Sequence, residues 1–271
     1  MSVANFPSSM NIAKQKEVCI PNCMPSFQRI RSDNATYAAG DIVRIEIPCG
    51  RKGDWLHPQD SFIEFKLNVV YTGGTAGVVS LDGNALSIFK TCRIYHGSNL
   101  LVNQQNCNRL WHALYDAQST SAERNAGQIS MGIDSACNSA VSVNKNTAGH
   151  TITSGNVYQY SFTLPVSLLG SLTANALPLT WMGASSLYLE LEMDQAARIL
   201  TTRSKADING AVGAMSTLPV YTGFTLSEIY YNAKISQLGP AYDNLLLSTF
   251  REGARSIRIP SVEYKGEVKT V

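Results

Sequence analysis

The stretch from Leu86 to Ala117 constrains the fold most, because it holds a strand, a turn and a helix in unbroken order. β-Branched and aromatic residues crowd positions 88–95, and the following His-Gly-Ser-Asn supplies residues that tolerate a tight turn. After a return segment at 100–102, Asn103 is placed to cap a helix. Apolar residues then recur at the spacing of one buried helix face: Cys107, Leu110, Trp111, Leu114 and Tyr115. The stretch predicts a hairpin followed by an amphipathic helix that lies across a sheet, with Trp111 in the core.

Most of the remaining chain alternates apolar and polar residues with the period of two that is typical of strands. The alternation slips near Glu228, which indicates a bulge. Gly239-Pro240 predicts the start of a second short helix. Strand-like runs cover 43–47, 63–69, 78–79, 158–164, 187–193, 229–235 and 257–262. Because strands and helices do not alternate, the pattern predicts an all-β fold, an eight-stranded antiparallel jelly-roll sandwich or barrel with two short helices and long loops.

Breaks in this pattern divide the chain. Residues 1–36 contain several prolines and no period, so we expect an extended N-terminal arm, anchored by Phe6 and Phe27, that adds little to the stability of the barrel. Residues 37–265 are expected to form the jelly-roll domain. Residues 266–271 are expected to be a tail or the start of a connector to a second barrel.

Three further segments have no strand pattern. Residues 50–60, GRKGDWLHPQD, are interpreted as a polar crossover between two strands. Residues 119–155 and 196–222 are interpreted as long loops, for which the sequence gives no role.

Composition excludes several classes of protein. A hydrophobic content of 44% is enough to bury a core without disulfides or metal. Charged residues make up 15% and the formal net charge is +2, so no specific nucleic-acid binding is expected. The sequence contains no apolar run long enough for a membrane span and no signal-peptide core, which predicts a protein made in soluble form. Six scattered cysteines favour a reducing compartment: Cys19, Cys23, Cys49, Cys92, Cys107 and Cys137.

No motif for catalysis, cofactor binding or metal binding is recognisable. The four histidines lie far apart, and Cys19 with Cys23 lacks a second ligand pair, so a plain turn is the better interpretation there. Glycosidase carboxylates carry no short motif, and Glu190 and Glu192 share one strand face, but a solvated outer face explains them better. We therefore expect no catalytic residue, no cofactor and no metal.

Two tryptophans are candidate contact residues. Trp55 and Trp181 lie beside Gly and Pro breakers, where an aromatic side chain can be exposed, and exposed aromatics are typical of interfaces. With Phe6 and Phe27 they complete the set of candidate contacts.

Two long segments resemble a known family. The run SIFKTCRIYHGSNLLVNQQNCNRLWHALYDAQST is similar to the segment of double jelly-roll major capsid proteins in which a strand ending in Tyr-His-Gly-Ser-Asn precedes a helix. FTLPVSLLGSLTANALPLTWMGASSLYLELEMD resembles paired strands of the same proteins, and Phe224–Lys265 resembles the end of their first jelly roll. The nearest members are capsid proteins of virophages and polinton-like viruses, within the lineage that includes large DNA viruses.

The resemblance implies a structural protein of an icosahedral virion, made in the host cytoplasm, that is not an enzyme. It implies a trimeric capsomer of two-barrel subunits, contacts with other capsid proteins and, in many members, an internal membrane beneath the shell. Members of the family have two barrels, whereas this chain has the length of one. The alternatives are a carbohydrate-binding, lectin-like jelly roll and a glycan-active enzyme on the same fold.

Overall fold

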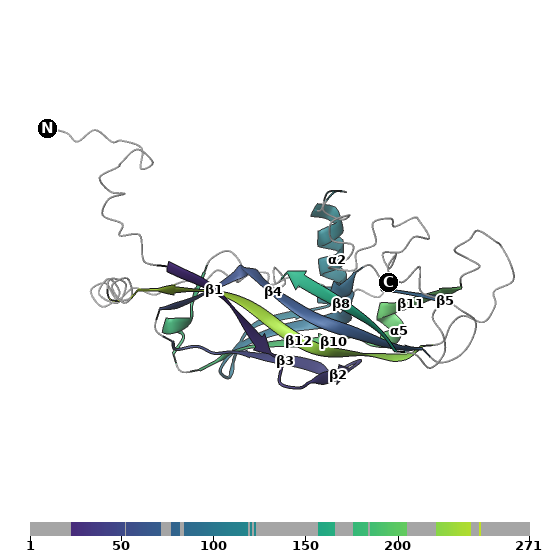
Figure 1. Ribbon diagram of the computed structural model, residues 1–271, viewed down its shortest axis with the longest axis horizontal. Helices are drawn as coiled ribbons and strands as arrows, with labels where there is room; N and C mark the ends of the chain where they lie inside the picture. The colour runs from purple at the N-terminus through teal and green to yellow at the C-terminus, as the bar shows by residue number, and fades with distance from the viewer. Residues whose placement is uncertain are drawn as a thin grey trace, which may run out of the picture.

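The computed structural model describes residues 23–51, 53–71, 77–81, 84–118, 120, 122, 157–165, 176–183, 185–204, 221–239 and 244. Two antiparallel sheets face each other (Figure 1). The larger has the order β1-β12-β4-β8, formed by Cys23–Arg31, Tyr221–Leu238, Asp54–Tyr71 and Val157–Pro165. The smaller has the order β3-β10-β6-β7, formed by Ile42–Ile47, Leu187–Met193, Phe89–His96 and Asn99–Gln105.

Shorter elements complete the described part. β2 (Thr36–Ala38) pairs with β12, and β9 (Leu177–Pro178) pairs with β4. β5 (Gly77–Leu81) and β11 (Leu200–Ser204) form a separate two-stranded ribbon. The helical elements are η2 (Ala85–Ile88), α2 (Cys107–Gln118), η4 (Leu179–Trp181) and α5 (Ala196–Ile199).

The pairing of the eight long strands follows one rule. β6 pairs with β7 in a hairpin, β4 pairs with β8, β3 with β10, and β1 with β12. The first long strand therefore pairs with the last, the second with the last but one, and so on to the hairpin. Successive strand pairs alternate between the two sheets. This is the chain path of a jelly roll, so the predicted fold class is confirmed.

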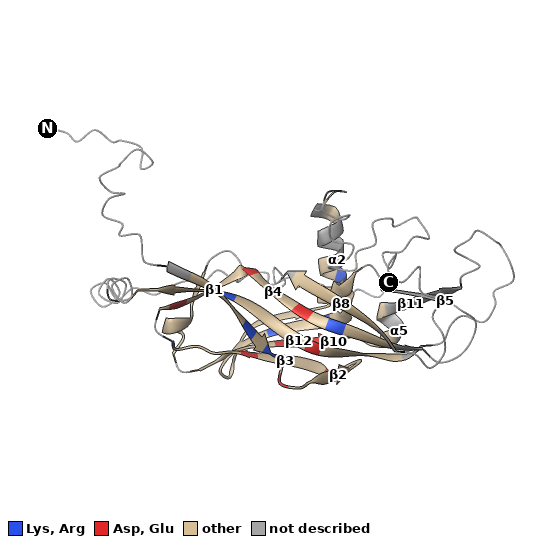
Figure 2. Cartoon of the chain, viewed as in Figure 1, with Lys and Arg blue, Asp and Glu red and all other residues tan. Residues whose placement is uncertain are grey.

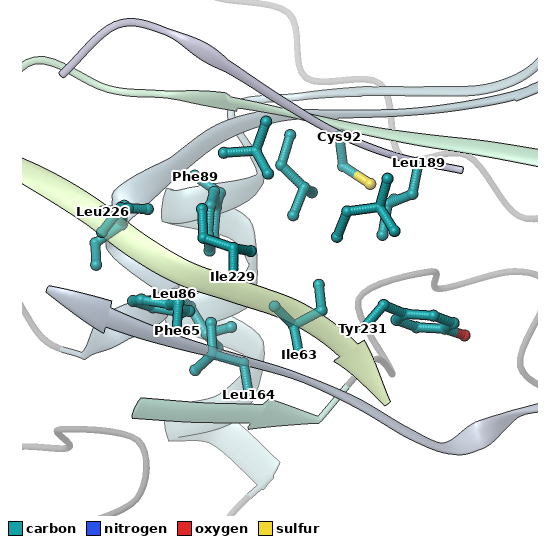
Figure 3. Close-up of a cluster of buried hydrophobic side chains, with 14 of the residues drawn as sticks. Ile63, Phe65, Leu86, Phe89, Cys92, Leu164, Leu189, Leu226, Ile229 and Tyr231 are labelled. Atoms are coloured by element: carbon teal, nitrogen blue, oxygen red, sulfur yellow. The ribbon is translucent and has the colours of Figure 1, made fainter. Parts of the chain in front are cut away.

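Alternating burial explains why these segments form strands. In β10 every second side chain, from Leu187 to Met193, is buried, and β3 buries Val43, Ile45 and Ile47 in the same way. These inward side chains fill the space between the sheets (Figure 3). The alternation predicted for these strands is therefore confirmed.

β12 contains the bulge that the sequence indicates. Glu228 has a φ of 50°, and the register with β4 shifts between Ser227 and Tyr230. The extra residue lets Leu226 and Ile229 both point inward, and both are buried. The predicted bulge is confirmed.

β4 begins earlier than the sequence suggested. The predicted polar crossover at 50–60 is wrong from Asp54 onward, because β4 pairs with β12 there too. His57 lies opposite Lys234 and Phe62 opposite Asn232, so four residues of β4 bulge out against one of β12. Pro58 lies in this bulge, where its missing N–H breaks no regular ladder bond.

The hairpin and the helix of the 86–117 stretch are confirmed, with a different junction. Asn103 does not cap the helix, because β7 continues to Gln105. Asn106, with a φ of 51°, makes the corner before α2 begins at Cys107. Trp111 is 9% exposed and belongs to the core, as expected.

Other expectations fall partly or wholly outside the described residues. The proposed loop 196–222 contains α5 and β11 in its described part, so that part is not irregular. The helix after Gly239, except for residue 244, the strand at 257–262 and almost all of 119–155 lie outside the described residues.

The predicted arm contains the first strand of the barrel. β1 pairs with β12 over nine residues, from Cys23 opposite Leu238 to Arg31 opposite Tyr230. It escaped the sequence pattern because, of its inward-facing Ser26, Gln28 and Ile30, only Ile30 is apolar. The boundary of the domain therefore moves from residue 37 to residue 23 or earlier, and Phe6 lies outside the described residues.

Two truncations test which N-terminal residues belong to the barrel. Deleting residues 1–22 removes no described strand, so the melting temperature should change by no more than a few degrees. Deleting residues 1–31 removes β1 and leaves the edge of β12 unpaired, so the melting temperature should fall sharply. Circular dichroism melts of the three chains would check this, and equal melting temperatures for both truncations would contradict the role assigned to β1.

Gly53 is expected to be irreplaceable at the start of β4. Its φ is +82°, and a Cβ there would lie 2.4 Å from the carbonyl oxygen of Leu238, whose N–H donates to Gly53 O at 2.8 Å. Gly40 is a matched control, with a φ of +87° and nothing within 4 Å. Gly40→Ala should cost about 1–2 kcal/mol of backbone strain, and Gly53→Ala should cost a further 1–3 kcal/mol, roughly, for the clash. Urea unfolding of both variants measures the difference. Equal losses of unfolding free energy would show that the backbone of β12 at Leu238 moves away from the new methyl group without an energetic cost.

Candidate assembly surface

The outer face of the larger sheet gathers aromatic side chains from three strands. Directly paired residues of antiparallel strands share a face, so Phe27 on β1, Phe62 and Trp55 on β4, and Tyr230 on β12 all lie on this outer side. The rings of Phe27 and Phe62 lie 6.1 Å apart at 50°, and the Arg29 guanidinium lies 3.7 Å above the ring of Tyr230. We call this surface the aromatic face.

Ion pairs surround the aromatic rings. Arg29 pairs with Glu64, Lys66 with Glu228 at 2.7 Å, and Lys234 with Asp60 at 2.7 Å. The hydrogen bond from Lys234 holds the pKa of the Asp60 carboxyl below its usual value. Because these pairs are partly exposed, each contributes little to stability, but together they leave the face close to neutral.

His57 lies in the same row as Lys234. Its Nε2 is 2.7 Å from the hydroxyl oxygen of Ser236. Burial lowers the pKa of His57, and the neighbouring Lys234 lowers it further against the opposing effect of Asp60. The imidazole is therefore neutral at pH 7 and adds no charge to the aromatic face.

The outer face of the smaller sheet is a lattice of charges. Arg44 lies 3.8 Å from Glu190 and 4.1 Å above the ring of Tyr188. Glu192 pairs with Arg93 at 2.9 Å and with Lys90 at 3.8 Å. Glu190 and Glu192 thus each pair with a cation on a neighbouring strand, as on a solvated face. Figure 2 shows Lys and Arg interspersed with Asp and Glu along the described strands of the two sheets.

The structure places three of the four predicted contact residues. Phe27 is 61% exposed, whereas Trp55 and Trp181 are half-buried. Trp181 lies in η4, which is held to the segment before β4 by a hydrogen bond from the hydroxyl of Thr180 to the carbonyl of Arg51. Whether any of these residues makes an intermolecular contact remains a prediction.

Two members of the aromatic face were missed from sequence. Phe62 and Tyr230 occupy positions of their strands whose alternating neighbours, Ile63 and Tyr231, are buried. An aromatic residue at an outward position is the signal that would have found them.

The described residues offer little for chemistry. Among them, no three His, Cys, Asp or Glu side chains converge as metal ligands, and no helix is both long and apolar enough to cross a membrane. Cys49, Cys92 and Cys107 are free thiols. Burial raises the pKa of Cys107 to about 12 and that of Cys92 well above its usual value, so neither is a ready nucleophile.

Comparison with known proteins finds structural similarity only. No protein-family model and no curated protein matches the sequence. The Faustovirus major capsid protein matches with a TM-score of 0.50 and 13% identity, over 92% of this chain and 59% of that chain. The PBCV-1 virus capsid matches with a TM-score of 0.43 and 14% identity, over 83% and 45%, and the mavirus major capsid protein with 0.40 and 10%, over 88% and 52%.

These matches bear on the fold. At 13% identity, the Faustovirus protein shows that the jelly roll described above also occurs in a viral major capsid protein. The resemblance predicted from sequence is confirmed at that level. The chain spans about half the length of the solved structures that it matches.

Because Cys107 is buried, the free energy of unfolding should fall at alkaline pH. Below pH 9 its thiol is protonated in both the folded and the unfolded protein, so its contribution to stability is constant. Between its ordinary pKa of 9.0 and its folded pKa of about 12, only the unfolded chain releases the proton, so the free energy of unfolding falls as pH rises. Cys107→Ala should flatten this fall.

Urea unfolding between pH 8 and pH 11 measures that slope. Cys49→Ala is the control, because Cys49 is only half-buried and its pKa is less perturbed. An unchanged alkaline slope in Cys107→Ala would contradict the assignment.

Proposed function

We propose that this chain is a structural subunit of an icosahedral virus shell. The observation that carries the proposal is the complete first-with-last strand pairing of a jelly roll, a fold shared with the Faustovirus major capsid protein. The exposed aromatic face supports it, because a shell subunit must present surfaces that bind other subunits. In this role the chain acts by self-association and without catalysis.

The finer features of the proposal follow the resemblance. The subunit would assemble into a capsomer, a trimer where a second barrel is supplied by the same polypeptide and a ring of single barrels otherwise. Its partners would be copies of itself and other capsid proteins, in many such virions above an internal membrane. It would be made in the host cytoplasm and end in the virion.

Self-association is the first test. Light scattering on the purified chain at micromolar concentration should give oligomers. The mass should change little between low and high salt, because the described charges of the aromatic face are largely paired within the chain. A glycan array run in parallel tests the alternatives. A strictly monomeric chain that binds a sugar or cleaves a glycoside would overturn the capsid proposal in favour of a lectin or a glycan-active enzyme.

A further inference from the structure

The aromatic face has the anatomy of a protein interface. Phe27 is the most exposed of the large apolar side chains in the described residues, at 61%, against 48% for Leu100, 46% for Ile42 and 43% for Leu101. It lies among three further aromatic rings and beside Arg29, and aromatic residues and arginine are the types that dominate binding energy at interfaces. Ion-paired charges lie between and beside these rings.

Strand register sets these side chains in rows across the sheet. One row runs from Arg31 on β1 through Tyr230 on β12 to Glu64 on β4. The next runs from Arg29 through Asn232 to Phe62. β12 is the middle strand of the three, so β1 and β4 flank it on opposite sides.

The two strands that flank β12 are complementary to each other. Consider a two-fold axis that runs parallel to β12, above the aromatic face. Rotation about this axis places β1 of the second copy over β4 of the first and β4 of the second copy over β1 of the first. Each row of one copy then faces the same row of the other. Two copies related by that axis place Arg31 of each opposite Glu64 of the other, and Arg29 of each opposite Phe62 of the other. Arg31 is exposed and makes no ion pair with another described residue, so a second copy supplies the carboxylate that it lacks.

We propose that the aromatic face docks on the same face of a second copy of this chain, about a two-fold axis parallel to β12. Sheets packed face to face lie about 10 Å apart, a gap that the rings of Phe27 and Phe62 from both copies fill. The inference rests on the proposed function, since a shell made of rings also needs contacts that join one ring to the next, and two-fold contacts are the commonest closed kind.

The apolar centre is tested with a matched pair of variants. Phe27→Ser removes the exposed ring from the aromatic face, and Leu100→Ser removes an exposed apolar side chain of the other sheet. Sedimentation velocity of the full chain should show the dimerisation constant weakened at least about tenfold by Phe27→Ser and changed less than about threefold by Leu100→Ser. Circular dichroism melts confirm that both variants fold, as expected for exposed positions.

A charge swap tests the two-fold geometry. Arg31→Glu and Glu64→Arg should each weaken the homodimer, because each places like charges opposite each other twice. An equimolar mixture of the two variants should restore association to near the parent level, since both contacts are then Arg with Glu. Arg44→Glu on the other sheet is the control, and its mixture with Glu64→Arg should restore nothing.

Each outcome decides between the two claims. A parent chain that stays monomeric overturns this inference, and it overturns the proposed function as well if the chain also binds a sugar or cleaves a glycoside. A parent chain that associates but tolerates Phe27→Ser, or a charge-swap mixture that fails to restore association, overturns the docking face and leaves the capsid proposal standing. If Leu100→Ser weakens association and Phe27→Ser does not, the interface lies on the smaller sheet.

Discussion

The pairing of β1 with β12 is the constraint on which the rest of the barrel depends. It joins the first and last long strands of the described chain, and it leaves β12 paired on both sides along much of its length. Among the described strand pairs, this one joins the segments farthest apart in sequence, so it carries the largest loop-closure entropy. The β6–β7 hairpin is the opposite extreme, since its strands are joined by one tight turn at Gly97.

Local patterns predicted the parts of the fold that depend on local physics. The alternation in β3 and β10, the hairpin turn, the bulge at Glu228 and the buried Trp111 are each decided by neighbours in sequence. β1 was missed because an edge strand buries little on its inner side, and Ile30 is the one side chain of β1, among those that the structure describes, that packs against the core. The start of β4 was missed because Pro58 normally ends a strand, and a bulge that accommodates it depends on the distant β12.

The candidate surface was harder to predict than the core for a physical reason. Burial of an inward position stabilises the fold itself, so it leaves a periodic signal, whereas an outward aromatic residue stabilises only a complex. Phe27 was recognisable as an isolated apolar residue, but its grouping with Phe62 and Tyr230 depends on register between three strands. Sequence supplies the residue types of such a surface, and only the pairing brings them together.

Three edge strands of the two sheets are poorly suited to pairing with another chain, which favours association through the face of a sheet. Unpaired strand edges can extend a sheet, and proteins block this with charges, prolines and bulges. β1 carries Pro25 and two arginines, and β3 exposes Arg44. β7 has neither charge nor proline, but its register with β6 shifts so that Leu101 is an extra residue, and this bulge interrupts a regular ladder. Three of the four sheet edges, β1, β3 and β7, are therefore poor templates for another strand. This favours the aromatic face as the surface on which a second barrel would bury apolar area without disturbing either sheet.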